Sequence, residues 1–189
     1  MPRPVWFEIP ADDPNYHDGG ALIPPRQALP EITDPVVIDG WSQARDSATP
    51  PIELTGAKMQ RPSPPPPSFD SRLGIDLLEW EGSAGGLVLK ANDCEVTGLV
   101  INSFSFCGLG ILGDHCVVQG NFVGTDWSGT VPLANGFGAD VVDYVRGCGI
   151  LISSSGNLIG GSSNRARNVI SGATGTIWNG IPVQALYAP

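Results

Sequence analysis

Asp114 and His115 adjoin in the sequence and have the side chains of a general acid and a general base. A carboxylate beside an imidazole orients the ring and raises its basicity, which is the chemistry of many hydrolytic sites. The pair lies at a predicted turn, opposite Asn92 and Asp93 of a neighbouring turn. A turn aspartate with a solvated histidine is therefore the favoured interpretation, ahead of a catalytic pair.

Asp140 and Asp143 are the candidate metal ligands, and Asp143 is also a candidate catalytic residue. Calcium takes about six to eight oxygen ligands in proteins, so two carboxylates alone make an incomplete site. Calcium is the one cofactor that the sequence suggests, and no other is expected.

Asp126, Trp127 and Tyr144 are the candidate ligand-binding residues. A tryptophan face can stack on a sugar ring, although core filling or loop anchoring is the more common role of such a residue. Asp126 begins the turn Asp-Trp-Ser-Gly, where a side chain that bonds the backbone of its own turn is favoured over catalysis or metal binding.

Hydrolysis of a glycoside needs two carboxylates about 5 to 9 Å apart. Alternation along the predicted strands pairs Glu95 with Val117 and Thr97 with Gln119 on the outward side. These rows do not form an acidic ladder, so the sequence leans against an enzyme.

The elements that must position these residues repeat along the chain. A four-residue phrase, glycine followed by alternating aliphatic residues, occurs twice at an offset of 22 residues (108 − 86): Gly86-Leu87-Val88-Leu89 and Gly108-Leu109-Gly110-Ile111. Two further copies of the phrase begin at Gly149 and Gly180. Self-similarity of this period indicates a stacked repeat architecture. We expect Leu87, Leu109, Ile150 and Ile181 to form one inward row.

The pieces of the repeat are short, alternating and rich in β-branched residues, with Gly, Asn or Ser between them. This pattern predicts strands and turns, and no helical periodicity accompanies it. The fold class that follows is all-β, a right-handed parallel β-helix (solenoid) lacking one or both caps. Asn121 and Asn168 are expected to face inward at bends and to bond the backbone of neighbouring coils, with solvated turns as the alternative.

The phrases Asn121–Thr130 and Leu133–Gly136 resemble a module of bacterial right-handed parallel β-helix repeat proteins, of the pectin-lyase-like fold group. Asn157–Gly161, Ala166–Gly172 and Leu29–Gly40 resemble the same family. The resemblance implies a coil of parallel strands in a large secreted or surface-attached protein.

Residues 1–189 read as a single domain with strands at 5–9 and 36–38 and with insertions at about 58–82 and 137–147. The first insertion contains the stiff proline run Pro62–Pro67. The capping segments that protect the open ends of a solenoid are missing, so the chain reads as a fragment of a longer protein.

A net charge of −9 and a pI near 4.4 argue against nucleic acid as a partner, because no basic run supplies the attraction to phosphate. No apolar stretch approaches the roughly 18 residues of a membrane span. No signal peptide is recognisable in this chain. An extracellular or cell-surface location, with polysaccharides or surface proteins as partners, is expected from the resemblance.

The four cysteines fall into two pairs by repeat position, Cys94 with Cys116 and Cys107 with Cys148. Equivalent positions on neighbouring coils lie about 4.8 Å apart, within reach of a disulfide. Bridged pairs and stacked free thiols both remain open, with the stacked thiols favoured for Cys94 and Cys116.

Two functions follow from these observations. The favoured one is a non-catalytic secreted or cell-surface module that presents loops for glycan or protein binding. The alternative is a partial or degenerate polysaccharide lyase or glycoside hydrolase, which rests on the resemblance in fold alone.

Overall fold

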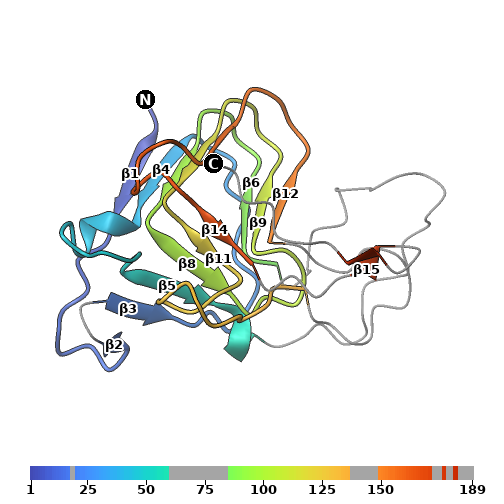
Figure 1. Ribbon diagram of the computed structural model, residues 1–189. Helices are drawn as coiled ribbons and strands as arrows, with labels where there is room; N and C mark the ends of the chain where they lie inside the picture. Colours follow the sequence, from blue (N-terminus) through green and yellow to red (C-terminus); the bar gives the residue numbers. More distant parts are fainter. Residues whose placement is uncertain (18–19, 60–84, 137–148, 172–175, 178–180, 183–189) are drawn as a thin grey trace.

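The computed structural model describes residues 1–17, 20–59, 85–136, 149–171, 176–177 and 181–182. Its strands are short and gather in three larger sheets and one two-stranded sheet (Figure 1). The two helical elements of the described residues are 3-10 turns, η1 (Gly40–Ser42) and η2 (Gly56–Lys58). No helix in this part of the chain has the length and apolarity that a membrane span requires.

The first sheet has five parallel strands in the order β1-β4-β7-β10-β13. They are β1 (Arg3–Trp6), β4 (Val36–Asp39), β7 (Glu95–Thr97), β10 (Val117–Gln119) and β13 (Leu158–Ile159).

The second sheet has six strands in the order β14-β11-β8-β5-β3-β2, of which only β2 is antiparallel to its neighbour. They are β2 (Tyr16–His17), β3 (Gly20–Ile23), β5 (Ile52–Thr55), β8 (Leu99–Asn102), β11 (Phe122–Val123) and β14 (Val169–Ile170).

The third sheet has three parallel strands in the order β12-β9-β6, and β15 and β16 form a separate antiparallel pair. These strands are β6 (Leu87–Leu89), β9 (Leu109–Ile111), β12 (Ile150–Ile152), β15 (Thr176–Ile177) and β16 (Ile181–Pro182).

The 22-residue repeat sets the register of these sheets. Leu87 lies opposite Leu109, and Leu109 lies opposite Ile150, as the repeat predicts. Ile181 does not continue this row, because β16 pairs with β15 in an antiparallel sheet. The inward row is thus confirmed for three of its four predicted members.

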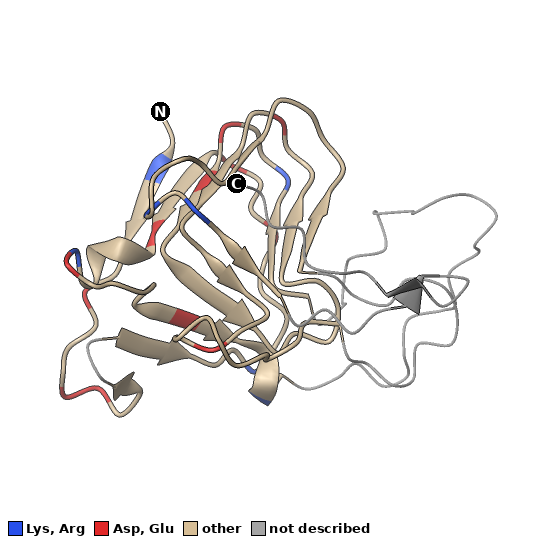
Figure 2. Ribbon diagram, in the orientation of Figure 1, with Lys and Arg blue, Asp and Glu red and all other residues tan. Residues whose placement is uncertain are grey.

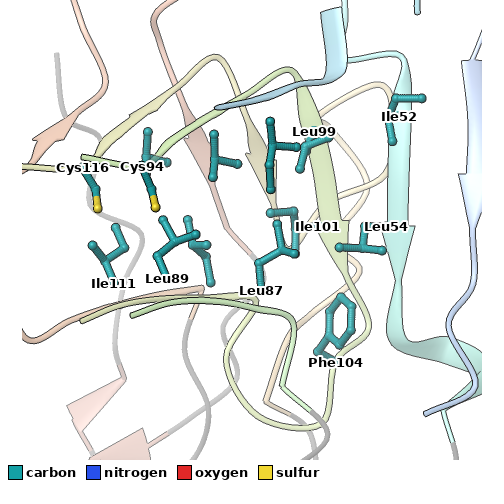
Figure 3. Packing of buried hydrophobic residues seen from close by; sticks show 14 of the residues in the cluster. Ile52, Leu54, Leu87, Leu89, Cys94, Leu99, Ile101, Phe104, Ile111 and Cys116 are labelled. Atoms are coloured by element: carbon teal, nitrogen blue, oxygen red, sulfur yellow. The ribbon is translucent and has the colours of Figure 1, made fainter. Parts of the chain in front are cut away.

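Alternation along each strand explains the core. In β7 and β10 the central residues Val96 and Val118 are fully buried, while their neighbours on each strand are partly exposed. The side chains that Figure 3 labels come from the second and third sheets and from segments that adjoin the strands. The same cluster includes Ile38, Val96 and Val118 of the first sheet. The largest fully buried apolar residues are Phe104, Ile52, Leu89, Leu99, Ile101, Leu109, Ile111, Val96, Val100, Val118 and Val123.

Asparagines join each turn of the chain to the one before it, as predicted for Asn121 and Asn168. The Asn121 Oδ1 accepts the Leu99 N–H at 3.0 Å, and its Nδ2 donates to the Val96 carbonyl at 2.8 Å. Asn168 makes the equivalent pair of hydrogen bonds in the next repeat: its Oδ1 accepts the Asn121 N–H at 2.9 Å, and its Nδ2 donates to the Val118 carbonyl at 2.8 Å. These amides satisfy backbone groups where the strands are interrupted.

The prediction of an all-β, right-handed parallel β-helix is wrong for the described residues. A closed solenoid needs one strand per turn in every sheet, whereas these sheets have five, six and three strands and do not close. Among the described residues before β6, strand pairing with the third sheet is limited to an isolated bridge from Ile32 to Leu89. Pro30 and Pro35 flank that segment and cannot donate to a ladder, so no strand forms there. The fold is a set of three mostly parallel sheets of short strands.

The two predicted insertions, 58–82 and 137–147, lie outside the described residues apart from Lys58 and Met59 at the start of the first.

Candidate binding surfaces

Asp114 and His115 occupy a turn between the third and first sheets. The Asp114 carboxylate accepts the Ser155 backbone N–H at 2.7 Å, which joins this turn to the next one. His115 has a positive φ of 58° and an exposed side chain that lies against Gly156. The favoured interpretation, a turn aspartate with a solvated histidine, agrees with this geometry.

Asp126 organises a loop over the outer side of the second sheet. Its Oδ1 accepts the Ser128 hydroxyl at 2.7 Å and the Val131 and Thr130 N–H groups at 3.1 and 3.3 Å. Desolvation tends to raise the pKa of this carboxyl, but these hydrogen bonds outweigh it and hold the pKa below its usual value. Asp126 is therefore an ionised turn residue, as its sequence position suggested.

The same loop is anchored at its far end by Asn135, which is almost fully buried. Its Oδ1 accepts the Phe104 N–H at 3.1 Å, and its Nδ2 donates to the Ile101 carbonyl at 3.0 Å. Between the two anchors the loop exposes Val131 and Leu133, which are 51% and 36% accessible. The loop is thus held in one shape with an apolar tip.

Trp127 is half-buried, and its indole packs directly against Gly20 and near Pro51, where a Cβ on Gly20 would have no room. This packing fixes the loop on the second sheet. The ring is thus used as an anchor, the alternative that the sequence had favoured over sugar stacking.

Glu53 is a buried carboxyl that was not among the candidate site residues from the sequence. It is 5% exposed in the middle of β5, and its Oε1 accepts the Asn102 Nδ2–H at 2.8 Å. The same Nδ2 donates to the Thr125 carbonyl at 2.9 Å, while the buried Asn102 Oδ1 has no partner among the described residues. Desolvation raises the pKa of Glu53, the Asn102 hydrogen bond opposes this, and the charge of Asp126 raises it further.

Glu53 and Asp126 are thus neighbouring carboxyls whose pKa values are moved in opposite directions. Two neighbouring carboxyls with separated pKa values are typical of a catalytic site in which one acts as the general acid and the other as the general base. Glu53 lies beneath the loop, however, so no substrate reaches it in this conformation.

The outer side of the first sheet carries a row of four residues, of which the sequence predicted the Thr97–Gln119 pair but not Trp6 or Asp39. Trp6 lies opposite Asp39, Asp39 opposite Thr97, and Thr97 opposite Gln119. The Trp6 side chain is 69% exposed, although it is the largest in the row. A strand had been expected at 5–9, and only the pairing of β1 with β4 shows that Trp6 shares a row with these polar residues.

Trp41, in η1 at the end of the same sheet, is covered rather than exposed. The Arg165 guanidinium lies 4.4 Å from the centre of its ring and also donates to the Arg45 carbonyl. Among the described tryptophans, Trp6 is the one that is exposed, since Trp41 and Trp127 are both partly buried.

Cys94 and Cys116 stack on neighbouring turns as free, buried thiols, side by side in the core (Figure 3). Burial raises the pKa of the Cys116 thiol. Cys107 is disulfide-bonded, and its predicted partner, Cys148, lies outside the described residues. Stacked thiols rather than a bridge are thus confirmed for Cys94 and Cys116.

The remaining candidates, Asp140, Asp143 and Tyr144, also lie outside the described residues. Within the described ranges no group of three or more His, Cys, Asp or Glu side chains is arranged to hold a metal ion.

No family model, curated protein or solved structure matches the chain. The resemblance to bacterial repeat proteins stays an expectation from the sequence.

Proposed function

We propose that the chain is a non-catalytic module of a secreted or cell-surface protein and that it binds a glycan. The observation that carries this proposal is the outward row of Trp6, Asp39, Thr97 and Gln119 on the first sheet. An open indole beside hydroxyl, amide and carboxylate groups matches a sugar, which has apolar ring faces and many hydroxyls.

The disulfide at Cys107 supports the proposed location. Disulfides persist in oxidising compartments and are rare where thiols are kept reduced. A secreted or surface-attached protein therefore suits this chain.

Binding is favoured over the alternative of a degenerate lyase or hydrolase. Among the described residues, Glu53 and Asp126 are the carboxyls with separated pKa values, and the loop that Asp126 organises closes off Glu53 from solvent. The residues of the outward row meet solvent without any movement of the chain.

Electrophoresis in gels containing soluble polysaccharides tests the proposal. We expect a glycan to slow the wild-type protein, and we expect Trp6→Ala to weaken that retardation about tenfold, equivalent to about 1.4 kcal/mol. Ile152→Ala is the matched control, because Ile152 is an exposed apolar residue, 47% accessible, on the third sheet. Equal retardation of wild type and Trp6→Ala would refute binding at this row.

The same samples, incubated with polygalacturonate and other acidic glycans with and without calcium, should release no products above background. Cleavage that Glu53→Gln abolishes would establish the enzyme instead.

A protein partner is the second candidate, and the exposed tip of the Asp126 loop favours it. Val131 and Leu133 offer apolar contacts on a loop that is already ordered, so little entropy is lost on binding. A Val131→Ser and Leu133→Ser double variant removes these contacts and leaves the Trp6 row intact, which separates the two candidates.

A further inference from the structure

We infer that the ligand of the first sheet is a neutral or amino-sugar polysaccharide lying across the strands, and that this surface rejects chains of uronic acids. The inference rests on the proposed function and adds the chemical class and the direction of the ligand.

The direction follows from the register. Trp6, Asp39, Thr97 and Gln119 stand on four consecutive strands, β1, β4, β7 and β10. Neighbouring strands are about 4.8 Å apart, so the row offers a contact at regular steps perpendicular to the strands. A chain of linked sugar rings has a comparable regular spacing, whereas a ligand along one strand would meet only two outward side chains.

The polar groups of the row are available to a ligand. In the part of the chain that the structure describes, the side chains of Asp39 and Thr97 have no hydrogen-bond partner in the protein, and both are partly exposed. Gln119 donates from Nε2 to the Gly160 carbonyl at 2.8 Å, which holds its amide in place. That bond leaves its carbonyl oxygen to accept from a sugar hydroxyl.

A second outward row strengthens the surface beside the first. Val37 lies opposite Glu95, and Glu95 lies opposite Val117, followed by the exposed Leu158. The valines and the leucine suit the apolar faces of sugar rings. Glu95 adds a carboxylate that is also without a protein partner among the described residues.

The charge of the surface decides which glycan it accepts. The outward positions of β1, β4, β7, β10 and β13 include two carboxylates, Asp39 and Glu95, and no Lys or Arg. The chain as a whole has 19 acidic and 10 basic residues, and Figure 2 marks those on the described ribbon. Carboxylates accept hydrogen bonds from hydroxyls and attract ammonium groups, but they repel other carboxylates.

The test compares three soluble polymers in native gels: hydroxyethyl cellulose, which is neutral, glycol chitosan, which is cationic, and polygalacturonate, which is anionic. We expect the first two to slow the wild-type protein and the third to leave it unaffected. The Asp39→Asn and Glu95→Gln double variant keeps the hydrogen-bonding groups and removes both charges. It should weaken the interaction with glycol chitosan about tenfold at low salt, and that with hydroxyethyl cellulose much less.

Asp46→Asn is the control for net charge, since Asp46 is exposed outside the sheet. Retardation by polygalacturonate equal to or stronger than that by the other polymers overturns this inference while leaving glycan binding in place. Retardation by none of the polymers refutes glycan binding itself, and with it the inference. Equal weakening by Asp46→Asn would show that net charge, rather than this surface, selects the polymer.

Discussion

The side-chain amide of Asn121 bonds the backbone of Leu99, one repeat of 22 residues earlier, at 3.0 Å. The fully buried amide meets the chain where β7 ends and β8 begins, a point at which the ladder between strands is interrupted. It therefore replaces hydrogen bonds that neither strand can supply.

Replacing Asn121 with Ala should lower the free energy of unfolding by about 3 kcal/mol, because the Leu99 N–H and the Val96 carbonyl both lose their partner. Urea unfolding followed by tryptophan fluorescence measures the change. Asn164→Ala, at an exposed position, should have almost no effect. A loss below about 1 kcal/mol for Asn121→Ala would show that these bonds are not important for stability.

Leu109→Ala should lower the free energy of unfolding by about 3 kcal/mol, because Leu109 is fully buried and its removal leaves a cavity. Ile150→Ala changes the next member of the same row, which is only partly buried, and should cost less than half as much. Equal losses of unfolding free energy for the two variants would contradict the difference in burial between Leu109 and Ile150.

Glu53→Gln should make the protein more stable than the wild type at neutral pH. The pKa of Glu53 is raised from about 4.5 on folding, so the folded state binds more protons than the unfolded chain as pH rises above that value. Stability then falls with rising pH until the folded-state pKa is passed. Gln keeps the acceptor for the Asn102 amide and does not ionise.

Unfolding curves for both proteins should converge below pH 4.5, where Glu53 is protonated in both states. Glu8→Gln, at an exposed position, serves as the control. A difference between wild type and Glu53→Gln that does not vary with pH would contradict the raised pKa.

Alkylation without reducing agent should modify Cys94 and Cys116 only after the protein is unfolded, because both thiols are buried and free. Cys107 should react only after reduction. Mass spectrometry of the digested protein distinguishes these sites and identifies the partner of Cys107. A native bond from Cys94 to Cys148, or from Cys107 to Cys116, would be incompatible with the register of the repeats.

The local pattern of the sequence was enough to predict the repeat, most of its register and the inward asparagines. Alternation at period 2 places Val96 and Val118 in the core whatever the rest of the chain does. The positions of Asn121 and Asn168 after a short strand likewise define a bend that needs a hydrogen-bonding side chain.

Contacts between distant segments decided the overall architecture and the surroundings of Glu53 and Trp6. A closed solenoid would need a strand near Ile32 to complete the third sheet, and the flanking prolines prevent that strand. Glu53 is buried only because the Asp126 loop folds back over β5, and Trp6 joins a polar row only because β1 pairs with β4. Periodicity reports which side of a strand a residue faces, but the neighbours it meets there are set by the pairing of strands and by the loops that cover them.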